Sequence, residues 1–158
     1  MKRKILIVED NVGLSQIQKD WLSRAGYEAV TAMNEPIARS LIRKTQFDLI
    51  LSDVRLPEGD GISLLEWLRK EKKDIPFIIT TEYVSVPDVV RTIKLGARDY
   101  LPKPVHREHL LELAEDVFHP VATVRKQERQ LFRRISPMIL KVEKFARLVL
   151  SLIHISEP

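Results

Sequence analysis

Five short apolar runs, each followed by a longer segment with helical spacing, constrain the fold of this chain more than any other feature. Several of these runs are apolar rather than alternating, which is typical of parallel strands covered by helices on both faces. We therefore expect strands at Lys4–Val8, Glu28–Ala32, Asp48–Ser52, Phe77–Thr81 and Asp99–Leu101.

Between the runs, apolar residues recur at the spacing of one helix face, as at Leu14, Ile17 and Trp21. Gly26 and Gly96 mark joins between segments. Five strand–helix units of this kind predict an α/β fold, a doubly wound five-stranded parallel sheet of roughly 120 residues. The 158 residues, 44% of them hydrophobic, suffice for that domain and an extension but not for a second full domain.

Polar side chains follow or end four of the predicted strands. Glu9 and Asp10 follow the first, Asp53 the third and Lys103 the fifth, while Thr81 ends the fourth. Because function in open parallel sheets gathers at the carboxyl ends of the strands, these residues should converge on one edge. Three carboxylates held together favour a hard divalent cation such as Mg²⁺, and the lysine adds a positive charge for an incoming anion. The pattern indicates a phosphoryl-transfer site.

The same residues stand in four segments that resemble the receiver domain of bacterial two-component response regulators, a flavodoxin-like (CheY-like) fold. The segments are VEDN, LILSDVRLPEGDG, IPFIITT and GARDYLPKP, which lie in the expected order within residues 2–117. The resemblance implies an aspartyl-phosphate switch rather than an enzyme. It also implies that the phosphoryl group comes from a phosphohistidine on a sensor histidine kinase.

The resemblance assigns the metal and phosphoryl chemistry to individual residues. Asp53 would be the phosphoacceptor nucleophile. Asp10, Asp53 and the backbone carbonyl of Arg55 would bind Mg²⁺, and Glu9 would act largely through water.

It also assigns the residues that respond to phosphorylation. Lys103 would pair with phosphoryl oxygens, and Thr81 would move to hydrogen-bond one of them. Tyr100 would turn inward as Thr81 moves, altering the face formed by the fourth helix, fifth strand and fifth helix. The Lys103–Pro104 peptide bond would be cis.

Two features bear on how this site would work. The family usually has Ala or Gly after the switch threonine, whereas this chain has Glu82 followed by Tyr83. Glu82 could repel the phosphate or narrow access, or could instead turn to solvent or pair with a cation.

Haloacid-dehalogenase-type phosphatases also use a strand-end Asp with Mg²⁺, but they need an acid where this chain has Arg55. The phosphatase is therefore a distant alternative.

Composition favours a cytoplasmic protein. The chain has no cysteine, no apolar run of membrane-spanning length and no signal-peptide pattern at its start. The formal net charge of +4 lies in the last part, because residues 1–119 hold 18 Lys and Arg against 19 Asp and Glu, and residues 120–158 hold 8 against 3. Solvated helix faces explain this basic charge better than contact with nucleic acid.

Apolar residues also recur at heptad spacing from the predicted fifth helix onward. Leu110, Val117, Val124 and Leu131 lie seven apart, and the alternate position holds Ala114, Val121 and Ile135. This seam predicts a homodimer formed through the fifth helix and a helical, coiled-coil linker. A merely amphipathic linker is the alternative, and Pro120 should interrupt the helix.

The segment Leu131–Val149 resembles the start of the AAA+ ATPase module in NtrC-type, sigma-54-dependent activators. That resemblance implies control of transcription, with DNA and sigma-54 RNA polymerase contacted only through output domains that these residues do not include. A receiver serving another output, or acting alone, is the alternative.

The last nine residues, LSLIHISEP at Leu150–Pro158, do not continue this resemblance. They can be encoded without mismatch by a transposase adapter used to prepare sequencing libraries. We expect the native sequence to diverge near Leu150, the alternative being a natural β-prone tail. The expected domains are then a receiver at 1–119, a linker and the start of an output domain at 120–149, and a non-native tail at 150–158.

Overall fold

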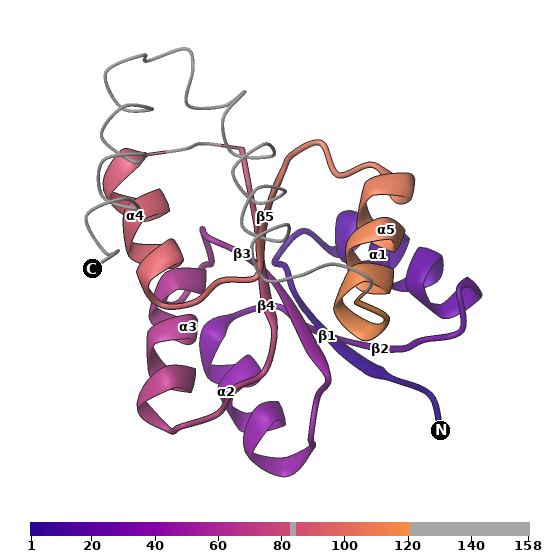
Figure 1. Ribbon diagram of the computed structural model, residues 1–158, viewed down its shortest axis with the longest axis horizontal. Coiled ribbons are helices and arrows are strands. Elements are labelled where there is room, and N and C mark those ends of the chain that lie inside the picture. Colours follow the sequence, from indigo (N-terminus) through magenta and orange to yellow (C-terminus); the bar gives the residue numbers. More distant parts are fainter. Residues whose placement is uncertain (83–84, 121–158) are drawn as a thin grey trace.

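A computed structural model of the chain describes residues 1–82 and 85–120, which form five strand–helix units (Figure 1). In chain order the elements are β1 (Lys4–Val8), α1 (Val12–Arg24), β2 (Glu28–Ala32), α2 (Glu35–Lys44), β3 (Leu49–Asp53), α3 (Gly61–Lys70), β4 (Phe77–Thr81), α4 (Val86–Lys94), β5 (Asp99–Pro102) and α5 (Arg107–Phe118).

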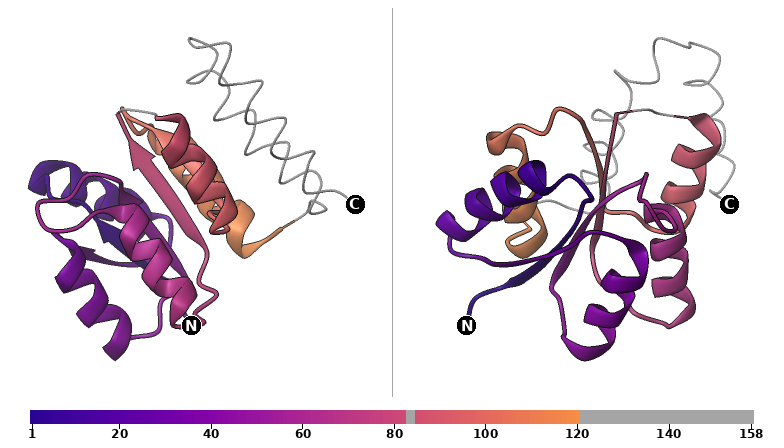
Figure 2. Two further views of the ribbon diagram at one scale, coloured as in Figure 1. Left: turned by 90° about the vertical axis from the view of Figure 1, so that its left-hand side faces the viewer. Right: turned by 180° about the vertical axis from the view of Figure 1, so that it is seen from behind.

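The five strands form one parallel sheet in the order β2-β1-β3-β4-β5. Helices α1 and α5 cover one face, and α2, α3 and α4 cover the other (Figures 1 and 2). The predicted doubly wound, CheY-like α/β fold is confirmed. No helix in the described ranges is long and apolar enough to cross a membrane.

Burial explains why most positions of β1, β3 and β4 are apolar. Successive side chains of a strand point to opposite faces, and here both faces are covered. In β1, Ile5 and Ile7 join the core beneath α1 and α5, while Leu6 and Val8 join the core beneath α2, α3 and α4. Every residue of β3 and β4 is buried.

Side-chain caps fix where most of the helices begin. The side chains of Asn11, Asn34, Asp60 and Ser85 each accept a hydrogen bond from a backbone N–H in the first turn of α1, α2, α3 and α4. These caps satisfy donors that a helix cannot pair internally. The caps of α1, α2 and α4 follow their strands closely, so these loops are short, whereas a longer loop of residues 54–60 joins β3 to α3.

The register of the sheet brings the strand ends level with one another. Val8 of β1 pairs with Ser52 of β3, and Asp53 pairs with Thr80 of β4. Thr81 pairs with Pro102 of β5. Residues directly beyond these pairs therefore meet at one edge.

Strand β3 begins and ends one residue later than predicted. Asp48 lies just before it and contacts Lys4 twice, since its backbone N–H donates to the Lys4 carbonyl at 2.8 Å and its Oδ2 accepts from the Lys4 N–H at 2.8 Å. The shift makes Asp53 the last residue of β3 itself. Tyr83 and the predictions for residues 121–158, which cover most of the heptad seam, the AAA+ resemblance and the tail, lie outside the described residues.

Candidate functional site

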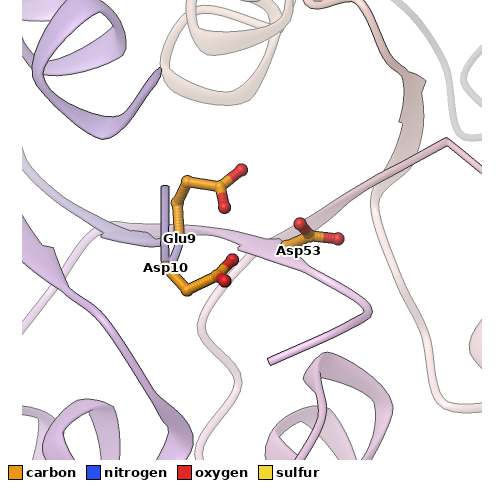
Figure 3. Close-up of side chains that lie close together, drawn as sticks. All are labelled: Glu9, Asp10 and Asp53. Atoms are coloured by element: carbon orange, nitrogen blue, oxygen red, sulfur yellow. The ribbon is translucent and has the colours of Figure 1, made fainter. Parts of the chain in front are cut away.

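Three carboxylates converge at the carboxyl edge of the sheet. Glu9 and Asp10 project from the end of β1 toward Asp53, which ends β3 (Figure 3). One carboxylate oxygen from each of the three residues lies within 4.8 Å of the others. Glu9 and Asp53 are buried and Asp10 is exposed, so the cluster has one side open to solvent.

The donor set fits Mg²⁺. This ion takes oxygen ligands, usually binds one or two carboxylates and keeps several of its waters. The cluster supplies hard oxygen atoms, and the exposed Asp10 leaves room for water on its open side.

Lys103 supplies the positive charge next to the carboxylates. Its Nζ donates to Glu9 Oε1 at 2.7 Å and to Asp53 Oδ2 at 2.6 Å. Burial opposes the charge on this lysine, but the hydrogen bonds to Asp53 and Glu9 outweigh that effect and raise the pKa of Lys103. The ammonium group therefore stays protonated between two acids that would otherwise repel each other.

Glu9 is the most enclosed of the three acids. Burial raises the pKa of Glu9 above its usual range, and the hydrogen bonds from Lys103 and from the backbone N–H of Asn11 oppose that rise. The N–H of Asn11 donates to the second carboxylate oxygen of Glu9 at 3.2 Å. Both oxygens of Glu9 thus have donors, which fixes the orientation of its side chain.

The segment after Asp53 turns back tightly over the end of β3. The Arg55 N–H donates to Asp53 Oδ1 at 3.2 Å, and the Gly61 N–H donates to the Val54 carbonyl at 2.8 Å. A Cβ at Gly61 would collide with the Asp53 carbonyl. Glycine is therefore required at residue 61 for the first turn of α3 to approach the strand end.

Thr81 and Tyr100 lie behind the acidic cluster, with exposed fractions of 2% and 1%. The Thr81 carbonyl accepts a hydrogen bond from the Lys103 N–H at 3.0 Å, which ties the end of β4 to the lysine. The ring of Tyr100 belongs to the core beneath α4, so it occupies the inward position in this structure. Burial is the main cause of a strongly raised pKa for its phenol.

The remaining predicted site residues lie at the rim. The Lys103–Pro104 peptide bond is cis. Glu82 is exposed directly after β4, and the side chain of Arg55 is also exposed. The structure therefore brings Glu9, Asp10, Asp53 and Lys103 into contact or near contact, with Thr81 directly behind them.

Sequence reasoning missed two supports of this site, the N–H of Asn11 and the close approach at Gly61. A signal existed for Gly61, because it stands in an Asp-Gly pair shortly after a strand and before a helical pattern. No comparable signal marks Asn11, because any residue other than proline carries the N–H that Glu9 uses.

A family model described as the response regulator receiver domain matches residues 5–115. The chain is 31% identical over 146 residues to the transcriptional regulatory protein GlrR of Escherichia coli (strain K12), covering 92% of this chain and 33% of that protein. It is 38% identical over 116 residues to the transcriptional regulatory protein ZraR of Klebsiella oxytoca, covering 73% of this chain and 26% of that protein. The chain thus spans a third or less of the length of these curated relatives.

Solved structures show the same similarity. A CheY-like response regulator receiver domain protein from Methanospirillum hungatei superposes with a TM-score of 0.71 at 30% identity, covering 82% of this chain and 99% of that chain. The non-phosphorylated HemR receiver domain from Leptospira biflexa gives a TM-score of 0.70 at 35% identity, covering 77% and 98%.

Proposed function

The chain belongs to the response regulator receiver domain family, and on that premise we propose that Asp53 accepts a phosphoryl group from the phosphohistidine of a sensor histidine kinase. A receiver domain is a phosphoacceptor rather than a catalytic enzyme, and this membership sets aside the phosphatase alternative. The observation that carries the assignment to Asp53 is its position at the end of β3, bound to Lys103 and adjacent to Glu9 and Asp10.

In the proposed transfer, a carboxylate oxygen of Asp53 forms a bond to phosphorus while the bond from phosphorus to the histidine nitrogen breaks. The histidine leaves with the electron pair and takes up a proton. Asp10, Asp53 and the Arg55 carbonyl would hold Mg²⁺, with Glu9 acting through water, and the ion would neutralise charge on the phosphoryl oxygens. Lys103 would donate to one of those oxygens in place of its present bonds.

Two further residues would act when Asp53 is modified. The buried hydroxyl of Thr81 would move to hydrogen-bond a phosphoryl oxygen. Tyr100, which the family resemblance expects to turn inward as Thr81 moves, is already buried in this structure and would stay there. Glu82 would restrain entry of the phosphate by charge repulsion. Replacing Glu82 with Ala should then speed phosphorylation by acetyl phosphate, and an equal rate would mean that Glu82 does not face the incoming phosphate.

A partner kinase would approach the carboxyl edge of the sheet, where the acidic cluster lies and where α1 begins. Large hydrophobic side chains stay exposed on α1 and around the start of α2, at Val12, Ile17, Met33 and Ile37. Of these, Val12 lies two residues beyond Asp10 and so places exposed apolar surface next to the acidic cluster. The exposed residues support recognition of a kinase domain that presents its phosphohistidine to the carboxyl edge.

For the output, we infer control of transcription. The curated relatives are named transcriptional regulatory proteins, and Leu131–Val149 resembles the start of a sigma-54-dependent AAA+ module. The heptad pattern supports a homodimer through α5 and the linker. DNA and sigma-54 RNA polymerase would be contacted by the output domains rather than by the receiver.

The assignment of Asp53 is tested by phosphorylation with acetyl phosphate and Mg²⁺, read by intact-mass spectrometry. The wild-type protein should gain one phosphoryl group and Asp53→Asn none. Asp20→Asn serves as the matched control, because Asp20 is an exposed aspartate on α1 away from the cluster. Equal labelling of Asp53→Asn and wild type would refute the assignment.

A further inference from the structure

Glu35 is a buried carboxylate that the proposed chemistry does not use. It is the first residue of α2, on the face of the sheet covered by α2, α3 and α4, and only 5% of it is exposed. Burying a charged group is costly unless it is paired and hydrogen-bonded. Its partners therefore indicate what it does.

Both oxygens of the Glu35 carboxylate have donors. Oε1 accepts from the guanidinium of Arg39, one turn later in α2, with an Nε–O distance of 3.1 Å and a second contact from Nη2. Oε2 accepts from the backbone N–H of Asp60 at 3.1 Å. Asp60 belongs to the loop between β3 and α3, which follows Asp53, so the carboxylate of Glu35 joins α2 to that loop.

The loop is shaped around this carboxylate. Gly59 has a φ of +81°, and a Cβ there would collide with the Glu35 side chain. The Glu35 N–H also donates to the Glu58 carbonyl at 3.3 Å. The end of the loop therefore contacts Glu35 through the backbone of three consecutive residues, Glu58, Gly59 and Asp60.

From Asp60 a short series of backbone contacts leads to the acidic cluster. Asp60 and Arg55 form an antiparallel bridge across the loop. The Arg55 N–H in turn donates to Asp53 Oδ1 at 3.2 Å. Glu35 is thus connected through Asp60 and Arg55 to the proposed phosphoacceptor.

Arg39, which binds the other oxygen of the Glu35 carboxylate, is also held in place. The Arg39 guanidinium that binds Glu35 lies over the Trp67 ring of α3, 5.2 Å from the ring centroid. A cation stacked on an aromatic ring keeps its charge while losing mobility. Arg39 therefore neutralises Glu35 and fixes it between α2 and α3.

We propose that Glu35 is a positioning residue for the phosphoryl-transfer site, holding residues 54–60 so that the Arg55 carbonyl is presented to the metal beside Asp53. The inference rests on the proposed function for the identity of the bound ion and for the Arg55 carbonyl as one of its ligands. Glu35 acts through the loop backbone, so its removal alters the site without removing any ligand.

Two substitutions of Glu35 separate its hydrogen bond to the Asp60 N–H from its negative charge. Glu35→Gln retains an acceptor oxygen for the Asp60 N–H, and Glu35→Ala removes it. Gly59→Ala leaves the charge of Glu35 unchanged but places a Cβ against its side chain, and it also strains the loop backbone because the φ of Gly59 is +81°, so Glu35→Ala is the decisive variant. Glu58→Ala is the matched control, because it removes an exposed carboxylate from the same loop and leaves the backbone contacts intact.

The first measurement is amide hydrogen exchange on the metal-free proteins, read by residue. Exchange at Asp60 and across residues 54–60 should be faster in Glu35→Ala and Gly59→Ala, while the strands β1 and β4 keep their wild-type protection. Glu35→Gln and Glu58→Ala should match wild type. Faster exchange spread evenly over the whole sheet would show a general packing role and overturn the proposal.

The second measurement is the Mg²⁺ dissociation constant by titration. Loss of an outer support typically weakens metal binding by about tenfold or more, which is expected for Glu35→Ala and Gly59→Ala. Glu35→Gln should rescue the affinity to near that of wild type. Wild-type affinity in Glu35→Ala would overturn the proposal. Wild-type protein that binds no Mg²⁺ would refute the proposed metal site instead. The exchange data would still show whether Glu35 holds residues 54–60 in place.

Discussion

At the scale of single residues, the Lys103 ammonium group holds Glu9 and Asp53 together where they would otherwise repel each other. The side chains of the three residues are at most 10% exposed, so water screens their charges weakly. Removing one partner from a buried ionic group leaves uncompensated charge, which is more costly than losing a surface pair.

Replacing Lys103 with Met should therefore destabilise the metal-free protein by about 3 kcal/mol. Mg²⁺ should recover part of that loss in the variant, because a cation at the cluster replaces the missing positive charge. Urea unfolding with and without Mg²⁺ measures both effects. Lys94→Met, at an exposed position on α4, is the control. A stability difference that Mg²⁺ leaves unchanged would contradict the electrostatic explanation.

Tyr100 gives a prediction for alkaline pH. Burial raises the pKa of its phenol, so the folded state binds this proton more tightly than the unfolded state, whose pKa is about 10. The resulting stability is present below pH 10 and is lost as the pH rises above it, by about 1 kcal/mol at pH 11.

Tyr100→Phe should remove this loss between pH 10 and 11. The Tyr100 hydroxyl is buried without a hydrogen-bond partner among the described residues, so Phe should cost less than about 1 kcal/mol at pH 7. Urea unfolding of both proteins at the two pH values tests this, with Tyr27→Phe as a less buried comparison. Equal alkaline losses in Tyr100→Phe and wild type would show that another group titrates.

At the scale of elements, Arg69 connects the end of α3 to the loop between α3 and β4 and to the loop between α4 and β5. Its guanidinium donates to the carbonyls of Leu95 and Gly96 at 2.8 and 3.2 Å, and to those of Lys73 and Ile75 at 3.0 and 3.2 Å. The loop before β4 and the loop before β5 are thus held by one side chain. A partly buried arginine can satisfy several backbone acceptors in this way because of its five donors.

Arg69→Met should cost about 2 kcal/mol or more, because it leaves carbonyls without donors while keeping much of the apolar contact. Glu66→Gln, which weakens the exposed contacts between α3 and Arg91, should cost less than about 1 kcal/mol. Chemical denaturation of the two variants measures the contrast. A larger loss in Glu66→Gln would mean that α3 and α4 depend on their surface pair instead.

The elements also show what the sequence could and could not predict. Strands β1, β2 and β4 have the predicted bounds because their apolar runs end abruptly at polar residues or turns. The convergence of Glu9, Asp53 and Lys103 was predictable because parallel strands share one carboxyl edge. The contact between Glu35 and Asp60 was not predictable, because nothing in an isolated helix pattern shows that the first residue of the helix contacts a loop more than twenty positions away.

At the scale of the whole molecule, both hydrophobic cores lie within residues 5–114. Every strand of the sheet and the helices on both faces belong to this range or end shortly after it. A protein truncated after Pro120 therefore keeps the apolar contacts that the described part of the chain makes.

That truncated protein should unfold cooperatively, in a single transition, when followed by urea unfolding. By sedimentation it should be monomeric where the full chain is dimeric. Val124→Asp combined with Leu131→Asp in the full chain should also give monomer. A full chain that stays monomeric at high micromolar concentration would defeat the heptad proposal and leave the receiver fold unaffected.

The strand order β2-β1-β3-β4-β5 has a consequence for how the chain folds as it leaves the ribosome. After β1 and β2 have paired, each later strand joins the edge that the preceding strands have already formed, in the order of synthesis. This strand order allows the nascent sheet to grow without rearrangement, but Lys103 emerges only after β5. Until then the carboxylates of Glu9 and Asp53 lack their cation, so the acidic cluster completes its charge balance only when the last strand is in place.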